Sequence, residues 1–531
     1  MQKFYDCGID LGTTNSCLAI PDNDHGFEII DNQADRMSVT PSAVLINGKG
    51  RMLIGQRAYN SQKVEDLAIQ FKRQMGLSKM IHFASAGVDK MPEELSSEIL
   101  KQLRSDAETR LNRPIENVVI TVPAAFKTLQ SEATNKAGKL AGFKNIILLQ
   151  EPIAAAVAYG AKPDSKDKHW MVFDYGGGTL DVAIISTLDN RLTVENSEGD
   201  NYFGGSDIDR ILFREVVLKK LKANGYHVDE LFDESTSSGK SMARKIQLDC
   251  ERCKIELSNK DTAILEIFDI DDDEDNPIEF ECEITRTELE ALIADTVERS
   301  IVIAKKALAG ADVKPEQLDK ILLVGGSTFI PLVRQRLAEE FGVPLDSSLN
   351  PMTVVAAGAA IYASTSVIDV EEEVELTSAN HAIINLTYDP ISSDETVNVI
   401  GKVANISDVS IDKVKIDCAI NKDFSGVCWT SGWMELLDQY TGIFDVDVLL
   451  QKGVLNHFRV SACDASGSEI VIENPYFDIK HNETVLKMSA PPATMSIGVQ
   501  IKDPKTGYDV LYHVIKKNSP LPAQDDRTFK L

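Results

Sequence analysis

The chain has 531 residues, of which 43% are hydrophobic and 26% charged, and 55 Lys and Arg against 82 Asp and Glu give a formal net charge of −27. This composition excludes a disordered, collagen-like or coiled-coil chain, and the length favours roughly three or four domains. The negative charge disfavours nucleic acid and anionic membrane surfaces as partners, and the sequence has no apolar run long enough to predict a membrane span. We therefore expect a cytoplasmic protein with neither nucleic acid nor membrane as a partner.

Residues 1–366 alternate short β-rich runs with helical patterns, which predicts an α/β domain. A weak internal repeat lies within this region. Asp10-Leu-Gly-Thr-Thr and Asp174-Tyr-Gly-Gly-Gly-Thr each follow one predicted strand and precede another. Two copies of one layered unit predict a cleft between two lobes, which is the usual place for a small ligand.

The composition changes near residue 367. Residues 367–380 contain the run DVEEEVE, which predicts a solvated acidic linker. From 381 to 482 the hydrophobic alternation has a period of two and turn residues separate the runs, which predicts an immunoglobulin-like antiparallel β-sandwich. Residues 483–531 hold only two or three further strands, too few to bury a sheet face independently.

The eight cysteines do not predict a disulfide scaffold in a chain of this length. Cys250 and Cys253 form a C-x-x-C within a helical pattern and have no second Cys or His pair nearby, so we expect no transition-metal site there. Cys418 and Cys463 could face each other across the two sheets of the sandwich, but a disulfide is not expected in a cytoplasmic chain.

Two glycine-containing turns carry the main signal for chemistry. Their tips consist of Gly12, Thr13, Thr14 and Asn15 in the first turn and of Gly176, Gly177, Gly178 and Thr179 in the second. Glycine lets backbone N–H groups approach anionic oxygens closely, and neither turn has the Walker pattern. We expect the turns to clamp phosphates from both sides, while Asp10, Asp174 and Asp181 hold Mg²⁺ directly or through its waters.

Seven segments across residues 1–366 resemble the nucleotide-binding domain of the seventy-kilodalton heat-shock protein family of DnaK-like chaperones. They are GIDLGTTNSCLAI, VVITVPAAF, LLQEPIAAAVAYG, FDYGGGTLDVAII, GDNYFGGSDID, CERCKIELS and ILLVGGSTFIPLV. The resemblance implies the duplicated ribonuclease-H-like lobes of the actin-like ATPase fold, ATP or ADP with Mg²⁺ as ligands, and slow hydrolysis of ATP to ADP and phosphate.

The resemblance also assigns roles to individual residues. Lys72 would position the attacking water and stabilise the charge on the γ-phosphoryl group, and Thr179 would orient that water. Glu151 would sense the γ-phosphate, with Pro123 as its coupled switch, while Thr13, Thr14 and Asn15 contact the β- and γ-phosphates. Glu251 and Lys254 would bind the ribose. The expected nucleoside pocket comprises Gly204, Gly205, Glu251, Lys254, Ser258, Gly325, Gly326, Ser327 and Phe329.

Three positions depart from the family pattern. Ile255 and Phe329 stand where the family usually has two arginines that sandwich the adenine, so we expect weaker nucleotide binding and relaxed base selectivity. Ser131 replaces an arginine that helps to transmit the ATP signal, which puts the coupling between domains in doubt.

The C-terminal region extends the resemblance. Residues 483–490 resemble the family's interdomain linker, and 491–531 resemble the start of its β-sandwich peptide-binding domain, here truncated. The sandwich at 381–482 is then an insertion between the nucleotide domain and the peptide domain.

Three functions are compatible with these observations. The favoured one is an ATP-driven chaperone for unfolded polypeptide or a dedicated client, with a J-domain co-chaperone and a nucleotide exchange factor as further partners. The alternative is a nucleotide-regulated scaffold with weak or no ATPase, which binds a dedicated partner through the inserted sandwich. A small-molecule kinase of the same superfamily is disfavoured because no sugar-binding segment or base aspartate is evident.

Overall fold

The computed structural model divides the chain into two compact units. The α/β unit comprises residues 4–366 and 487–531, and the β unit comprises residues 1–3 and 367–486. The residues that the structure describes are 4–22, 26–160, 168–188, 191–268, 270–366, 382–388, 391–392, 395–405, 411–422, 424, 426–436, 442–473, 475–481, 487–488, 497–502 and 509–515. The predicted acidic linker at 367–380 lies outside the described residues.

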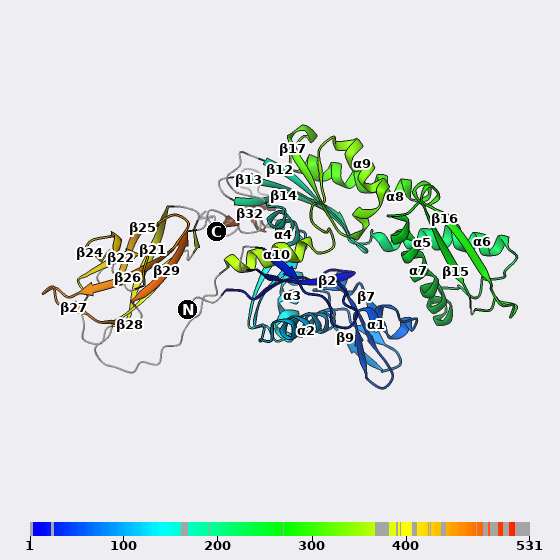
Figure 1. The fold of residues 1–531 in the computed structure, drawn as a ribbon, viewed down its shortest axis with the longest axis horizontal. Helices are drawn as coiled ribbons and strands as arrows, with labels where there is room; N and C mark the ends of the chain where they lie inside the picture. The colour runs from blue at the N-terminus through cyan, green and yellow to red at the C-terminus, as the bar shows by residue number, and fades with distance from the viewer. Residues whose placement is uncertain are drawn as a thin grey trace. The chain divides into compact units, whose positions relative to one another are not determined.

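Two sheets with the same strand order form the centre of the α/β unit (Figure 1). The first sheet has the order β11(Asn145–Gln150)-β10(Asn117–Val122)-β1(Cys7–Asp10)-β2(Asn15–Pro21)-β3(Phe27–Ile29). The second has the order β18(Leu345–Asp346)-β17(Leu318–Val324)-β12(Lys168–Tyr175)-β13(Leu180–Leu188)-β14(Arg191–Asp200), followed by the short β30(Lys487–Met488). In each sheet an antiparallel hairpin is continued on one side by two parallel strands. The internal repeat predicted from the sequence is confirmed.

The central parallel strands are buried on both faces. All six residues of β10, the run NVVITV, are buried, as expected for a β-branched strand covered on both sides by other elements. Helices α4(Glu151–Ala158) and α10(Val354–Thr365) pack against each other, and α10 also packs on β1 (Figure 1). Gly358 permits this close approach, because a Cβ at that position would collide with the backbone carbonyl of Ala154.

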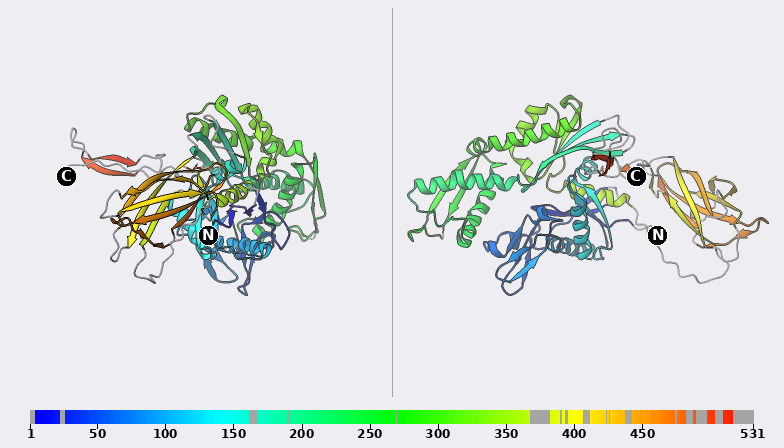
Figure 2. Two further views of the ribbon diagram at one scale, coloured as in Figure 1. Left: turned by 60° about the vertical axis from the view of Figure 1, so that its left-hand side comes forward. Right: turned by 180° about the vertical axis from the view of Figure 1, so that it is seen from behind.

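The second copy carries a large hydrophobic core. It is built from β12, β13 and β17, from α7(Ser237–Leu257), α8(Arg286–Gly310) and α9(Pro331–Phe341), and from the hairpin β15(Thr262–Ile267) and β16(Phe280–Thr285). Helix α8 begins where the Thr285 hydroxyl accepts a hydrogen bond of 3.1 Å from the Glu288 N–H. Figures 1 and 2 show α5(Gly205–Leu212), α7 and the β15–β16 hairpin gathered at one end of the α/β unit.

The first copy also carries smaller elements outside its main sheet. A three-stranded sheet of β6(Met52–Ile54), β5(Ala43–Ile46) and β7(Leu67–Ile69) supports α1(Gln56–Tyr59), and the short 3₁₀ helix η2(Phe71–Gln74) follows. Helices α2(Pro92–Leu111) and α3(Thr128–Leu140) pack against each other beside the main sheet. These small elements matter because they bring Lys72 to the first and Tyr59 to the second of the two cavities described below.

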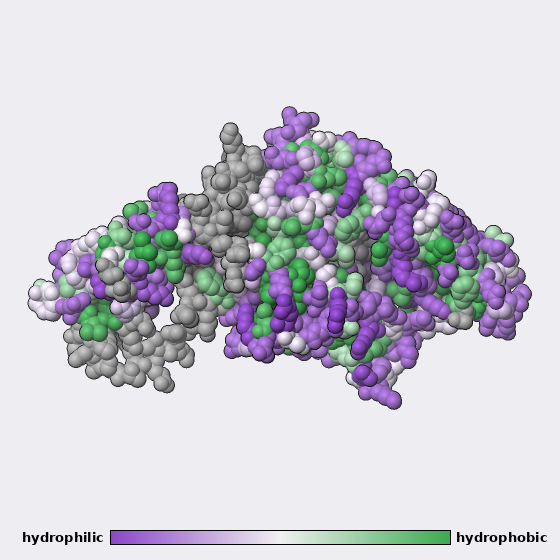
Figure 3. Space-filling model, in the orientation of Figure 1, coloured by the Kyte–Doolittle hydropathy of each residue, from purple (hydrophilic) through white to green (hydrophobic). Residues whose placement is uncertain are grey.

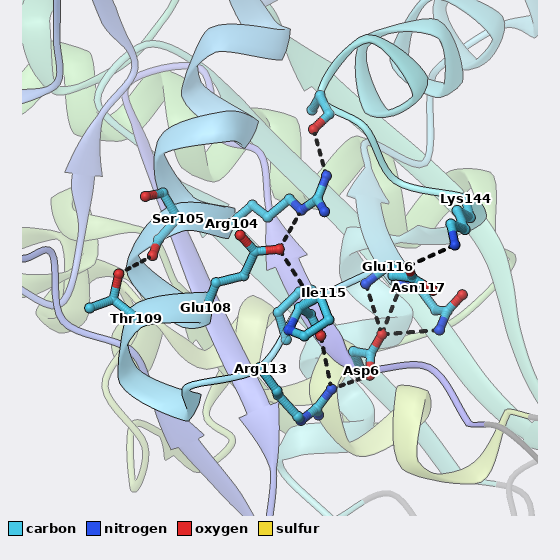
Figure 4. Close-up of polar contacts among 12 residues, drawn as sticks. Asp6, Arg104, Ser105, Glu108, Thr109, Arg113, Ile115, Glu116, Asn117 and Lys144 are labelled. Atoms are coloured by element: carbon cyan, nitrogen blue, oxygen red, sulfur yellow. Dashed lines mark hydrogen bonds and ion pairs between the residues drawn. The ribbon is translucent and has the colours of Figure 1, made fainter.

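The start of β1 is held by the carboxylate of Asp6 (Figure 4). Its oxygens accept hydrogen bonds from the Arg113 guanidinium at 2.7 Å, from the Glu116 N–H at 3.0 Å, and from the Asn117 N–H and side-chain amide at 2.9 and 3.0 Å. Three of these bonds go to the residues that lead into β10. One acidic side chain therefore joins β1 to its parallel neighbour.

The β unit is a two-sheet sandwich. One sheet has the order β25(Ile443–Leu449)-β21(Thr396–Asn405)-β19(Ala382–Tyr388)-β28(Ile472–Glu473). The other has the order β20(Ile391–Ser392)-β29(Tyr476–His481)-β26(Leu455–Cys463)-β22(Lys413–Ala419)-β23(Val427–Thr430). Both sheets contribute to one core, which includes Val399 and Phe444 from the first and Ile416 and Phe458 from the second. The predicted β-sandwich is confirmed, and its described ladders are antiparallel except for β19 with β28 and β20 with β29.

The expectation that Cys418 and Cys463 face each other across the two sheets is wrong. They lie on the neighbouring strands β22 and β26 of one sheet, where Cys418 is opposite Phe458 and Cys463 is opposite Lys413. Because residues 413 and 418 are an odd number of positions apart, the two thiols also belong to opposite faces. Alternation predicts which residues share a face within a strand, but not which strands share a sheet.

The described C-terminal residues form β30 and the antiparallel hairpin of β31(Ile497–Lys502) and β32(Asp509–Ile515). From the predicted linker 483–490, Lys487 and Met488 are described, and they pair in parallel with Arg191 and Leu192 of β14. No helix among the described residues combines the length and apolar character needed to cross a membrane. On the face shown in Figure 3, hydrophilic residues separate small groups of hydrophobic ones.

Candidate nucleotide site

The two predicted phosphate turns face each other. The first joins β1 to β2, and the second joins β12 to β13. A Cβ on Gly177 would lie 2.8 Å from the Thr14 hydroxyl, and one on Gly178 would lie 3.2 Å from the Thr13 methyl group. The tips therefore approach so closely that the second turn has no room for side chains at these two positions.

Both turns line one cavity of about 840 Å³, counted with the solvent at its mouth. Its lining includes Asp10, Gly12, Thr13, Thr14, Asn15, Lys72, Arg73, Pro123, Glu151, Asp174, Gly176, Gly177, Gly178, Thr179, Asp181, Gly325 and Gly326. The hydroxyl oxygen of Thr14 is buried and has no hydrogen-bond partner among the described residues. A buried polar atom without a partner is costly, so this hydroxyl is suited to a ligand in the cavity.

Four carboxyl groups gather at this cavity. Asp10 ends β1 and accepts a hydrogen bond of 3.1 Å from the Thr121 hydroxyl, while Asp174 and Asp181 are directly opposite each other in the β12–β13 ladder. Glu151 is the first residue of α4. Asp10 and Asp174, which come from equivalent strands of the two copies, line the same cavity.

Burial and electrostatic repulsion raise the pKa values of the three aspartates. Burial, followed by the charge of Glu151, raises the pKa of Asp10 and of Asp181 to about 7. The same two causes, reinforced by Asp181 and Asp10, hold the pKa of Asp174 well above its usual range. Lys72 opposes each shift without cancelling it. The cluster is thus short of positive charge, which is the condition that a bound cation would relieve.

Lys72 and Glu151 form a buried ion pair, with 2.7 Å between the lysine Nζ and the carboxylate Oε1. Lys72 is only 4% exposed and Glu151 only 8%. Burial alone would lower the pKa of Lys72, but the charges of Glu151 and Asp10 outweigh it, and the net direction is upward. Lys72 therefore stays protonated at neutral pH and presents a cation to the cavity.

Arg73 is a residue that the sequence prediction missed. It donates a hydrogen bond to the Gly178 carbonyl of the opposite turn, and its guanidinium lies 5.3 Å from the ring centre of Tyr202. Its Nε is buried and has no hydrogen-bond partner among the described residues. The sequence could have indicated Arg73 as a site residue, because Arg73 directly follows Lys72 in the run QFKRQMG.

A second cavity shares Thr13, Thr14 and Gly177 with the first and has a volume of about 700 Å³. Glu251 and Lys254, the predicted ribose ligands, both line it. Lys254 is bound to Asp209 at 2.7 Å and to the Gly205 carbonyl at 3.0 Å. Burial, opposed by Lys254, raises the pKa of Asp209 to about 6.

Several of the other residues predicted for the nucleoside pocket line neither cavity. Ser327 donates a hydrogen bond of 2.9 Å to the Gly176 carbonyl, and a Cβ on Gly204 would lie 2.5 Å from the Gly178 nitrogen, so both pack behind the second turn. Ser258 follows α7 and bonds back to the Lys254 carbonyl. Phe329 is 37% exposed and Ile255 is 57% exposed, and neither lines the two cavities.

Within the described parts of the chain, no three His, Cys, Asp or Glu side chains converge closely enough to hold a metal ion by themselves. The Cys250 and Cys253 pair lies in α7, as the helical pattern predicts, and both thiols are buried.

The α/β region of the chain is similar in sequence to a protein family and to several curated proteins. The sequence model of the family described as "Hsp70 protein" matches residues 6–377. "Chaperone protein DnaK" of Thermosipho africanus (strain TCF52B) is 36% identical over 368 residues, which cover 68% of this chain and 59% of that protein. The proteins of the same name from Thermosipho melanesiensis and Mycoplasmopsis agalactiae are each 36% identical, over 365 and 374 residues, covering 68% and 70% of this chain and 59% and 60% of those proteins.

The match covers the duplicated α/β region and both phosphate turns, while the chain spans about 60% of the length of these curated relatives. Residues 4–366 thus have the actin-like ATPase fold, followed in the chain by a β-sandwich. The protein belongs to the Hsp70 family.

Proposed function

We propose that this protein is a Mg²⁺-dependent ATPase of the Hsp70 type, in which the nucleotide state controls the binding of unfolded polypeptide. The observation that carries the proposal is that two equivalent turns, Lys72 and four carboxyl groups all line one cavity. Opposed backbone loops, a buried cation and surplus carboxylates are the parts that phosphoryl transfer to water requires.

Different residues of the chain would bind the phosphates, stabilise the developing charge and orient the water. Thr13, Thr14 and Asn15 would bind the β- and γ-phosphates, and the free hydroxyl of Thr14 is suited to such a contact. Lys72, held in place by Glu151, would stabilise the charge that develops on the γ-phosphoryl group. Thr179 would orient the attacking water.

The residues present also fit a magnesium ion. Asp10, Asp174 and Asp181 would hold it directly or through its waters, because Mg²⁺ in phosphate sites keeps several waters beside one or two carboxylates. When bound, Mg²⁺ would neutralise phosphate charge and relieve the repulsion within the acid cluster.

Hydrolysis would change the contacts that join the two copies of the fold. Lys72 and Glu151 come from the first copy, whereas Gly178 and Asp181 come from the second, so a ligand in the cavity would contact both copies. We infer that loss of the γ-phosphate shifts the population between closed and open arrangements of these elements.

The part of the chain beyond residue 366 would bind the client. We propose that residues 381–482 are an inserted sandwich and that residues 491–531 begin a substrate-binding β domain. The partners of the whole protein would be unfolded polypeptide or a dedicated client, a J-domain co-chaperone and a nucleotide exchange factor. The cytoplasmic location expected from the sequence stays a prediction.

A second candidate is a nucleotide-regulated scaffold with weak or no ATPase activity. The observation that favours it is that Ile255 and Phe329 are exposed and lie outside both cavities. They stand at the positions where the family usually has two arginines that stack on the base. Loss of two cation–π contacts would weaken nucleotide binding.

Calorimetric titration with ATP, ADP and GTP in the presence of Mg²⁺, followed by steady-state ATPase assays, tests the proposal and separates the two candidates. We expect binding, and we expect Lys72→Met to lower turnover roughly 100- to 1,000-fold. Lys79→Met is the matched control, because Lys79 is exposed and lies outside the cavities. Binding without turnover in the unmodified protein would support the scaffold, and no binding of any nucleotide would contradict both.

A further inference from the structure

Two cysteines of the β unit lie side by side on neighbouring strands. The Sγ atoms of Cys418 on β22 and Cys428 on β23 are 3.7 Å apart, and the Cys428 thiol also donates to the Cys418 carbonyl at 3.3 Å. Cys418 belongs to the hydrophobic core of the sandwich. Cys428 is exposed, and the other seven cysteines of the chain are all buried.

A β-bulge produces this contact. The ladder between β22 and β23 pairs Cys418 with Trp429 but then pairs Ala419 with Val427, so Cys428 is the extra residue on its strand. In a regular ladder the residue next to Trp429 would point to the opposite face from Cys418. A bulge re-aims the side chain of the inserted residue, and here it turns the Cys428 thiol toward Cys418.

The two thiols differ in their access to solvent. Burial, together with the neighbouring Cys428 thiol, raises the pKa of Cys418 to about 12, so Cys418 stays protonated at neutral pH. Oxidants in solution reach Cys428 first, because Cys428 is exposed and Cys418 is buried. The arrangement is that of an accessible thiol with a second thiol directly behind it.

We propose that Cys428 and Cys418 are a modification site that forms a reversible disulfide when the protein meets hydrogen peroxide. The Cys428 sulfur attacks the peroxide, the O–O bond breaks, and Cys428 sulfenic acid and one water are produced. The Cys418 sulfur then attacks the sulfenic sulfur, an S–S bond replaces the S–O bond, and the departing hydroxyl takes the Cys418 proton to give a second water. Two thiols are oxidised by two electrons in total and one peroxide is reduced.

The consequence of this step is local and structural. β23 is the last strand on its side of the sheet order, next to β22. The disulfide would fasten this strand covalently to the core strand beside it. A dithiol reductant would reverse the change by thiol–disulfide exchange.

Peptide mapping of the full-length protein tests the proposal directly, because Lys422 separates the two cysteines. Trypsin places Cys418 in residues 416–422 and Cys428 in residues 423–452. After peroxide treatment of the native protein and alkylation of free thiols, we expect these two peptides to be joined without reductant and separate with it. The joined species should weigh two hydrogen atoms less than the sum of the peptides. Cys463→Ser, on the neighbouring strand β26, is the matched control and should give the same linked pair.

Two variants identify the order of events. Cys428→Ser should remove the single fast-reacting thiol, and Cys418→Ala should stop oxidation at Cys428 sulfenic acid, which dimedone traps. Equal dimedone labelling of Cys428 in the unmodified protein and in Cys418→Ala would overturn the proposal. So would a map in which Cys428 is oxidised while Cys418 is still fully alkylated. The map of the unmodified protein decides the matter even if a variant fails to fold.

Discussion

The hydroxyl of Tyr59 donates a hydrogen bond of 2.9 Å to the carboxylate of Glu251, although the two residues lie 192 positions apart in the chain. Tyr59 ends α1 and Glu251 lies in α7, and both line the second cavity. The guanidinium of Arg244 lies 4.5 Å from the centre of the Tyr59 ring. This contact joins the small elements of the first copy to the helix that carries the proposed ribose ligands.

Removing the Tyr59 hydroxyl is expected to speed nucleotide release. Tyr59→Phe keeps the ring beneath Arg244 but removes the bond to Glu251, and a net loss of about 1 kcal/mol corresponds to roughly fivefold faster dissociation. Stopped-flow displacement of a fluorescent nucleotide measures the rate. Tyr226→Phe is the control, since that hydroxyl bonds to the Glu279 carbonyl and lies outside the cavity. Equal rates for both variants would show that the bond does not hold the site closed.

The acid cluster predicts how stability depends on pH. Asp10 and Asp181 have pKa values of about 7 in the folded protein against 3.8 ordinarily, so between about pH 4 and pH 7 the native state binds more protons than the unfolded state. The free energy of unfolding without ligand should therefore fall as pH rises through this window, by about 1.4 kcal/mol per pH unit for each extra proton. Urea unfolding at a series of pH values measures the slope.

Asp10→Asn provides the control for that slope, because an amide does not titrate and the slope should become shallower. Mg²⁺ with nucleotide should bind more weakly at pH 5 than at pH 8, since binding needs ionised carboxylates. A free energy of unfolding that rises between pH 5 and pH 7 in the unliganded protein, with no change in Asp10→Asn, would contradict the assignment of the buried acids.

The close approach of the phosphate turns predicts different outcomes for two neighbouring glycines. A Cβ on Gly177 would lie 2.8 Å from the Thr14 hydroxyl, whereas the nearest atom to a Cβ on Gly176 is the Thr179 carbonyl oxygen at 3.6 Å. Gly177→Ala should therefore destabilise the α/β unit by about 1–3 kcal/mol through overpacking, and Gly176→Ala should cost much less. Thermal and urea unfolding compare the two variants, and similar losses would show that the turns can separate freely.

The Asp6 network predicts a structural effect far from the phosphate turns. Asp6→Ala removes the acceptor for the Glu116 and Asn117 N–H groups and for Arg113, so we expect a loss of about 2–3 kcal/mol of unfolding free energy. Asp319→Ala, at an exposed position on β17, is the matched control. Chemical denaturation measures both. A loss no greater than that of the control would mean that water replaces the lost acceptor.

Much of the α/β fold could be predicted because its signals are local. The turns after Asp10 and Asp174 carry their glycines and hydroxyls in consecutive positions, and the alternating strands around them repeat in the same order. The β-sandwich was predictable for the same reason, since a period of two is visible within single strands. The pairing of those strands was not, and the error over Cys418 and Cys463 follows from that.

The sequence alone identified the family, the two equivalent turns and Lys72, because each of these lies in a short run of neighbouring residues. Only the tertiary structure revealed that Arg73 reaches the opposite turn, that Tyr59 bonds to Glu251, and that a bulge sets Cys428 against Cys418. These contacts depend on strand register and on the packing of elements distant in the chain, and the period of a single strand or helix does not encode either.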